Sequence, residues 1–183
     1  WGPLRQLKIR LNKIDPLDSF RKTIYGASIS GAQRKGLFNL HAGILGAATV
    51  RAAFILKPQG EYEQLPENEH VTMAIAKALG FKVPDIAILE SKIGKIFAVK
   101  RFDLLDNGQA RLEDVAQILK VPGDDKYQSS NEKVAAAIKD FSDIPNLDLE
   151  DFWKRLLFCY LTGNADMHLK NWSLLEIKTL KGL

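Results

Sequence analysis

The sequence is poor in the residues that build covalent or metal frameworks. Cys159 is the only cysteine among 183 residues, which excludes an intramolecular disulfide framework and fits a reducing cytoplasm. The three histidines, His41, His70 and His168, are far apart in sequence and have no cysteine companions, so the spacing of a zinc site is absent. No apolar run approaches the length of a membrane span. We therefore expect a globular, cytoplasmic protein without membrane association.

The charge is unevenly spread along the chain. The formal net charge is +4, but residues 1–35 hold eight basic and two acidic side chains, a local charge of +6. Such a basic segment can attract the phosphates of a nucleotide or a nucleic acid, although a solvated basic surface accounts for most of these residues. Aromatic interleaving of the kind that binds single strands is missing, so direct nucleic-acid binding is not expected. The opening Trp1-Gly2-Pro3 has neither an initiator methionine nor a signal-peptide pattern, which indicates a piece of a longer chain.

The hydrophobic pattern predicts strands in the first half of the chain and helices in the second. The clearest helix is 67–80, because its apolar residues form one stripe, Glu67 and Glu69 lie in its first turn and Gly80 follows it. A second strong helix at 149–162, capped by Asp148, is so apolar that deep burial is expected. The other expected elements are strands at 7–11, 50–56, 83–89, 96–102 and 172–175, a hairpin of 23–30 with 37–40, a flexible small-residue stretch at 41–49 and short helical segments near 113–119 and 132–141.

This order of elements predicts an α+β fold with two lobes. We expect a β-rich N-lobe at residues 1–103, a helical C-lobe at 104–183 and a cleft between them.

One polar loop after the second strong helix has the spacing of a catalytic loop. Asp166 and Asn171 form the pattern D-x-x-x-x-N, in which kinases use the aspartate to accept a proton from the substrate hydroxyl and the asparagine to hold a metal ion. Taken alone, this spacing is better explained by a structural turn, since both residue types are common in loops. His168, between them, either donates to a phosphate or a carboxylate, or holds the loop because its side chain bonds to backbone groups.

Two upstream residues favour a catalytic loop over a structural turn. Lys57 ends an apolar strand, as a phosphate-pairing lysine does in kinases, and Glu69 lies twelve residues further on in the following helix, where it can pair with that lysine. Separately, Lys57 is explained by a solvated strand end and Glu69 by the helix dipole. The order of hairpin loop, lysine, glutamate and D-x-x-x-x-N loop is much harder to explain by accident.

Two longer motifs then resemble the HipA-like kinase family. Residues 28–35 fit the family's nucleotide loop, S-x-x-G-x-Q-x-K, and residues 164–171 are similar to its N-x-D-x-H-x-K-N. Shorter segments follow in family order, including Val99–Asp103 and Glu113–Gln117. The resemblance covers residues 24–175.

The resemblance implies a kinase fold and a set of site residues. Asp166 would be the catalytic base, with His168 and Lys170 beside it, and Asn171 would bind Mg²⁺. Ser28 matches a serine that family members autophosphorylate, and an acidic residue is common where this chain has Lys100. The residues that would surround ATP are Ser28, Ser30, Gly31, Ala32, Gln33, Lys57, Glu69 and Lys100.

The resemblance also implies a biological role. Family members are Ser/Thr protein kinases that act as toxins, phosphorylate an aminoacyl-tRNA synthetase and are held by a HipB-like, DNA-binding antitoxin. The short stretch before Ser28 leaves the family's N-terminal subdomain to a separate partner or to a missing part of the chain. The family's second metal-binding aspartate has no counterpart before Leu183, so a chain ending there is expected to transfer almost no phosphate. A catalytically inactive binding module and a basic regulatory or nucleic-acid-binding domain remain the alternatives.

Overall fold

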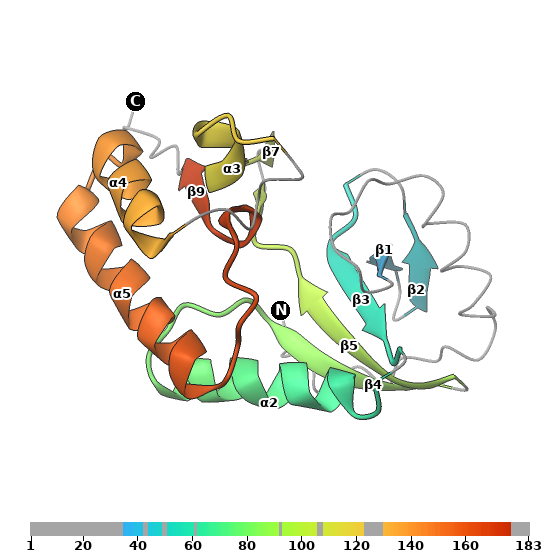
Figure 1. Ribbon diagram of the computed structural model, residues 1–183. Helices are drawn as coiled ribbons and strands as arrows, with labels where there is room; N and C mark the ends of the chain where they lie inside the picture. The colour runs from blue at the N-terminus through green and yellow to red at the C-terminus, as the bar shows by residue number, and fades with distance from the viewer. Residues whose placement is uncertain are drawn as a thin grey trace. The chain divides into compact units, whose positions relative to one another are not determined.

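The computed structural model describes seven stretches of the chain: residues 35–41, 44–48, 51–60, 62–91, 93–105, 108–122 and 130–176. These residues form two compact units, which divide between Leu104 and Leu105 (Figure 1). The predicted strands at 7–11 and 23–30 and the loop residues 28–33 lie outside the described residues. None of the described helices is long and apolar enough to cross a membrane.

The described residues of the first unit form a five-stranded antiparallel sheet with one long helix. Its strands are β1 (Gly36–His41), β2 (Ile44–Ala47), β3 (Phe54–Pro58), β4 (Ile86–Ser91) and β5 (Gly94–Lys100), arranged in the order β2-β1-β3-β5-β4. Helix α2 (Leu65–Ala78) runs along β4 and β5 (Figure 1). One sheet face carries the hydrophobic core of the unit, which consists of Phe38, Leu45, Phe54, Leu56, Ala87, Leu89, Ile96 and Ala98.

Side-chain alternation along β3 divides its residues between the two faces of the sheet. Phe54 and Leu56 are buried in the core, so Ile55 and Lys57 lie on the opposite face. The register of β3 with β5 sets Lys57 directly opposite Phe97, whose side chain is buried. The second face is therefore covered as well, and Lys57 lies on it.

Three expectations for this unit were wrong in detail. Residues 44–47 form an edge strand, although the small residues of 41–49 predict flexibility. Helix α2 begins at Leu65, with a proline in its first turn, so Glu69 lies in the second turn. The stripe made by Val71, Ile75 and Leu79 is exposed, because α2 turns Pro66 and Ala76 inward, and a small alanine lets a helix approach a sheet closely.

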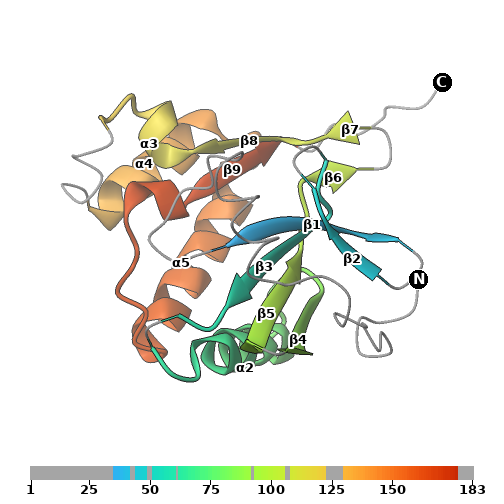
Figure 2. The same ribbon diagram turned by 90° about the vertical axis from the view of Figure 1, so that its right-hand side faces the viewer.

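The described part of the second unit contains three helices, a 3₁₀ turn and a strand pair, and a further strand pair begins at the boundary residue Leu104. The two-stranded pairs are β6 (Leu104–Leu105) with β7 (Gly108–Gln109) and β8 (Arg111–Asp114) with β9 (Ser173–Glu176), the latter seen side by side in Figure 2. The helices are α3 (Val115–Ile118), α4 (Asn131–Phe141) and α5 (Pro145–Leu161), followed by the 3₁₀ helix η3 (Leu169–Asn171). Its core consists of Val115, Ala116, Val134, Ala137, Ile138, Phe152 and Leu169.

Helix α5 differs from the prediction at its start and in its burial. It begins at Pro145, and Asp148 lies in its first turn and accepts a hydrogen bond from Ser142 Oγ. Of the helix residues, only Phe152 is buried, and a flank of four apolar side chains remains exposed. Hydrophobic content alone did not reveal this, since it does not say which elements are present to cover a helix. The side chains of this flank are Trp153, Leu157, Tyr160 and Leu161, and Leu147 near the start of the helix is exposed as well.

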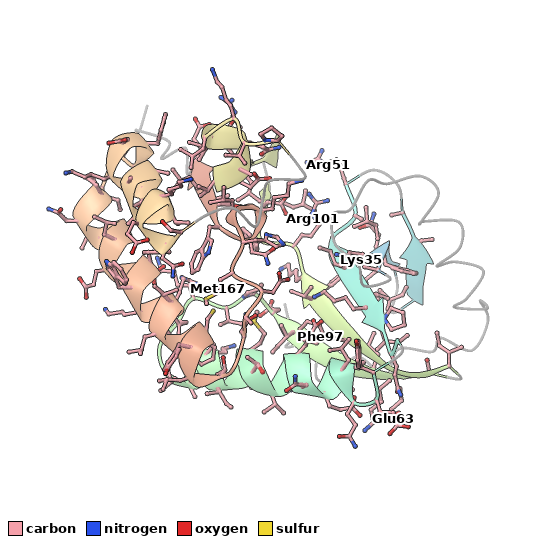
Figure 3. All side chains as sticks on the ribbon, viewed as in Figure 1. Lys35, Arg51, Glu63, Phe97, Arg101 and Met167 are labelled. Carbon is pink, nitrogen blue, oxygen red and sulfur yellow. The ribbon has the colours of Figure 1, made fainter. Side chains whose placement is uncertain are left out.

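A buried ion pair fixes the end of the first unit. Asp103 is the one charged residue among those described that is classed as buried, and its carboxylate accepts two bonds from Arg101, one of them from Nε at 2.9 Å. This pair raises the pKa of Arg101. The backbone N–H of Arg101 also donates to Ala53 O at 2.8 Å. Arg101 is labelled in Figure 3.

We expect Asp103→Ala to lower the free energy of unfolding by about 2 to 3 kcal/mol, because Arg101 keeps a partly buried charge without its carboxylate. The matched control is Asp85→Ala, which removes an exposed carboxylate 4.0 Å from Lys100 in the same unit and should cost less than about 0.5 kcal/mol. Urea unfolding followed by circular dichroism measures both. Equal losses for the two variants would contradict a structural role for the Arg101–Asp103 pair.

Candidate functional site

A lysine–glutamate pair joins the sheet to the helix in the first unit. Lys57 Nζ donates to Glu69 Oε2 at 2.7 Å, and the two side chains are 26% and 21% exposed. Lys57 also lies 5.8 Å from the centre of the Phe97 ring, a distance at which a cation is attracted to an aromatic face. The predicted contact between strand-end lysine and helix glutamate is therefore present, although Glu69 belongs to the second turn of α2.

Lys35 joins this pair and was not among the site residues expected from the sequence. Gly36 pairs with Leu56 in the antiparallel ladder, so Lys35 stands one step further on, opposite Lys57. Burial lowers the pKa of Lys35, nearby Lys57 lowers it further and Glu69 opposes the shift. A sequence signal existed, because Lys35 is the last residue of the S-x-x-G-x-Q-x-K motif.

Lys35, Lys57 and Glu69 together form what we call the lysine cluster. Lys35 and Phe97, which lies opposite Lys57, are labelled in Figure 3. Two cations and one carboxylate leave a net positive charge on a half-buried surface when both lysines are protonated, and such a surface attracts anions. The cluster can therefore accept a phosphate.

Lys100 does not join the lysine cluster. It ends β5 three residues after Phe97, so alternation along the strand turns it to the other face of the sheet. Its ammonium lies 4.0 Å from Asp85 at the surface. The remaining predicted nucleotide-binding residues, 28 and 30–33, lie outside the described part of the chain.

The second unit holds the D-x-x-x-x-N loop in a defined shape. Asn171 Nδ2 donates to the backbone carbonyl of Asp166 at 2.6 Å, which ties the two ends of the pattern together. Leu169, between them, is 1% exposed and forms part of the core. The Trp172 indole also reaches the carbonyl of Met167, at 3.4 Å. The loop is thus fixed by one buried side chain and two side-chain bonds to its backbone (Met167 is labelled in Figure 3).

Asp166 and His168 share this loop with opposite exposure. His168 Nε2 lies 3.4 Å from Asp166 Oδ1, and the side chains are 11% and 68% exposed, respectively. His168 therefore contacts a carboxylate from a largely buried position, as one of the two explanations left open by the sequence predicts. The Asp166 carboxylate is accessible to a reactant. Lys170 lies half-buried within η3.

The side-chain oxygen of Asn171 is suited to be one ligand of a hard cation. Its amide nitrogen is used in the bond to Asp166, so its oxygen keeps the acceptor capacity, and Mg²⁺ prefers oxygen ligands. Within the described stretches, no group of three or more His, Cys, Asp or Glu residues could hold a metal ion. Glu176, in β9, lies 3.9 Å from Arg111. Asn171 could therefore offer one oxygen ligand to Mg²⁺, and the remaining ligands would have to come from other groups.

Comparison with known proteins identifies relatives of this chain. A family model described as HipA-like C-terminal domain matches residues 27–182. Y4dM of Sinorhizobium fredii, a kinase candidate by name, is 35% identical over 130 residues, covering 64% of this chain and 32% of that protein. The serine/threonine-protein kinase toxin HipA of Shewanella oneidensis is 30% identical over 169 residues, covering 80% of this chain and 39% of the toxin. The chain spans about a third to a half of the length of the curated relatives it matches.

Solved structures agree with the sequence relatives. The Shewanella oneidensis HipA toxin, solved with HipB and operator DNA, matches with a TM-score of 0.65 and 25% identity, over 82% of this chain and 40% of that one. The Helicobacter pylori proinflammatory kinase CtkA matches in fold, with a TM-score of 0.60 and 23% identity, over 82% of this chain and 50% of that one. Both matches confirm the predicted α+β, kinase-like fold.

The geometry of the lysine cluster predicts opposite changes in the pKa of Lys35, whose ordinary value is 10.5. Lys57→Met removes a neighbouring cation and should raise the Lys35 pKa, whereas Glu69→Gln removes a carboxylate and should lower it further. NMR titration of lysine ε-carbons, assigned with Lys35→Arg, measures both shifts. Glu90→Gln, on the edge strand β4, is the control and should leave the pKa of Lys35 unchanged.

The same shift predicts a pH dependence of stability. A lowered pKa in the folded state means that the unfolded chain binds more protons between that pKa and 10.5, so Lys35 makes stability rise with pH in this window. Lys35→Met should remove the rise.

A Lys35 pKa that is insensitive to both Lys57→Met and Glu69→Gln would show that the three side chains are not clustered in solution.

Proposed function

This chain belongs to the HipA-like C-terminal domain family, and we propose that it forms the ATP-binding and phosphoryl-transfer part of a Ser/Thr protein kinase. The observation that carries this proposal is the Asn171 bond to the Asp166 carbonyl at 2.6 Å, beside an exposed Asp166 carboxylate. It gives the loop the two groups that phosphoryl transfer requires, a proton acceptor and a metal ligand. The Lys57–Glu69 pair supports the same function from the other unit.

In this proposal the lysine cluster binds the phosphates of ATP. Lys57 offers a positive charge that its bond to Glu69 keeps in one orientation, and such positioning is a large part of catalysis in kinases. Lys35 adds a second cation opposite Lys57 in the strand ladder. Glu69 would have two roles in this cluster. Its carboxylate orients Lys57 through the hydrogen bond, and its negative charge offsets the repulsion between the two lysines.

The loop of the second unit would act on the acceptor side of the reaction. Asp166 accepts the proton of the substrate hydroxyl as the oxygen attacks the γ-phosphorus, the bond from phosphorus to the β,γ-bridging oxygen breaks, and ADP leaves. Asn171 would hold Mg²⁺, which when bound neutralises charge on the phosphates. His168 keeps the Asp166 carboxylate in place from its buried position. Lys170 follows in the same turn and supplies positive charge near the transferred group.

For the substrate, we propose the class that the family resemblance of the two motifs implies. The kinase would modify a translation component such as an aminoacyl-tRNA synthetase. A structural relative is described with HipB and its operator DNA, which supports an antitoxin partner that is itself a DNA-binding protein. A separate protein that resembles the family's N-terminal subdomain is a further proposed partner. The single Cys159 is consistent with a cytoplasmic location.

The central test compares variants of the lysine cluster with variants of the catalytic loop in the natural protein. Asp166→Ala should reduce phosphoryl transfer by about 10²- to 10⁴-fold, since the proton acceptor is lost, while Mg·ATP binding stays nearly unchanged. Lys57→Ala should weaken ATP binding clearly, and Glu69→Ala should affect turnover more than affinity. Calorimetry measures binding, and transfer of labelled phosphate measures turnover. Asp140→Ala, an exposed carboxylate of α4, is the control.

Two outcomes would contradict this assignment. Unchanged ATP affinity in a folded Lys57→Ala protein would remove Lys57 from the nucleotide site. A natural protein that binds Mg·ATP but transfers no phosphate, with or without Asp166, would favour the inactive binding module instead.

We also propose that Ser28 is autophosphorylated and that this modification switches the kinase off. The support is the S-x-x-G-x-Q-x-K pattern, together with the charge of the product, because a phosphoserine would repel the phosphates of ATP. Phosphopeptide mapping after incubation with ATP should find phosphate on Ser28, and Ser28→Ala should prolong activity. Modification elsewhere, with Ser28 and Ser30 never phosphorylated, would overturn this proposal.

A further inference from the structure

The Glu113–Gln117 segment has a defined structure but no role in the chemistry described above. Asp114 is the N-cap of α3, and its carboxylate accepts the backbone N–H of Gln117 at 2.8 Å. Gln117 reciprocates, because its side-chain oxygen accepts the backbone N–H of Asp114 at 3.1 Å. This reciprocal pair is a capping box, which satisfies two backbone donors that a helix start leaves open.

Such a cap matters more for α3 than for a longer helix. Helix α3 has four residues, Val115–Ile118, and a helix of this length is not stable by itself because nucleation is unfavourable. Its persistence depends on the capping box and on the burial of Val115 and Ala116, which are 1% and 2% exposed.

The same segment is bonded to the catalytic loop at the residue after Asn171. The backbone N–H of Val115 donates to Trp172 O at 2.9 Å, and Asp114 pairs with Ser173 in the β8–β9 ladder. Val115 and Ala116 also share a core cluster with Leu169, the buried residue of η3. The loop that carries Asp166 and Asn171 therefore has one end attached to the start of α3, both by a backbone bond and by packing.

We propose that Asp114 and Gln117 are positioning residues for the catalytic loop. Their capping box holds the start of α3 in the geometry in which Val115 bonds to Trp172, and this contact fixes the position of the neighbouring Asn171. Neither side chain touches the reacting atoms. The proposal rests on the proposed kinase function for its effect on turnover, whereas its structural part is independent of that function.

The position of Asn171 is sensitive to this support for a geometric reason. Asn171 precedes Trp172 directly, and its amide must keep the bond to the Asp166 carbonyl while presenting its oxygen outward. A displacement of Trp172 rotates the backbone from which that amide projects. In catalytic sites, a shift of about 1 Å in a positioned group can cost as much as 10²-fold in rate.

The test uses Asp114→Ala, with Asp114→Ser as the conservative partner, since serine also serves as an N-cap. In the natural protein, Asp114→Ala should lower kcat about tenfold or more and leave the KM for ATP within about twofold, because the lysine cluster is untouched. Asp114→Ser should restore most of the turnover. Gln117→Glu keeps the capping box and should behave like the parent, and Glu113→Ala, an exposed neighbour, is the control.

A second measurement does not depend on activity. The Trp172 indole N–H donates to Met167 O inside the loop, so its NMR signal should exchange faster with solvent in Asp114→Ala of the 183-residue chain and return toward the parental rate in Asp114→Ser.

The outcomes separate the two proposals. Unchanged kcat and unchanged Trp172 exchange in a folded Asp114→Ala protein would overturn the positioning role and leave the kinase standing. Equal losses in Asp114→Ala and Asp114→Ser would also overturn it, since the cap would not be the cause. If the natural protein itself transfers no phosphate, the proposed function fails, and the exchange of Trp172 in the 183-residue chain still decides whether the capping box holds the loop.

Discussion

The bond between Lys57 and Glu69 is the interaction on which the chemistry of the first unit depends. It joins the central part of the sheet to α2 over 2.7 Å, and both side chains are only about a quarter exposed, so neither charge is well solvated without the other. Lys35 enters the same surface because the β1–β3 register leaves it opposite Lys57. A sheet register, a helix position and one ion pair thus gather positive charge where an anion can bind.

In the second unit, the polar loop that carries Asp166 and Asn171 is held rigid while its reactive groups remain accessible. Burial of Leu169 and the bond from Asn171 to Asp166 fix the backbone, while the Asp166 carboxylate stays exposed. The start of α3 contacts the end of this loop, because the backbone N–H of Val115 donates to Trp172 O. The arrangement lets a short, solvent-facing segment hold two groups at a constant spacing, and phosphoryl transfer depends on such positioning.

The sequence predicted local features of the fold better than features that depend on packing. The Lys57–Glu69 contact and the α+β order followed from an apolar strand, a helical stripe and their spacing. The exposed stripe of α2 and the exposed flank of α5 did not, because periodicity shows that a face is apolar without showing what covers it. Lys35 was missed since its nearness to Lys57 arises from strand register, a long-range property. The bond of Asn171 to the Asp166 carbonyl likewise becomes visible only with coordinates.

The central claim is that the lysine cluster of the first unit binds the phosphates of ATP. Mn²⁺ is paramagnetic and broadens NMR signals near it, so Mn·ATP reports which residues surround the bound metal. We predict that the ε-carbons of Lys35 and Lys57 broaden together when Mn·ATP is added, and that excess Mg·ATP restores both signals. Sharp signals from both lysines, with broadening confined to acidic surface residues, would contradict the account.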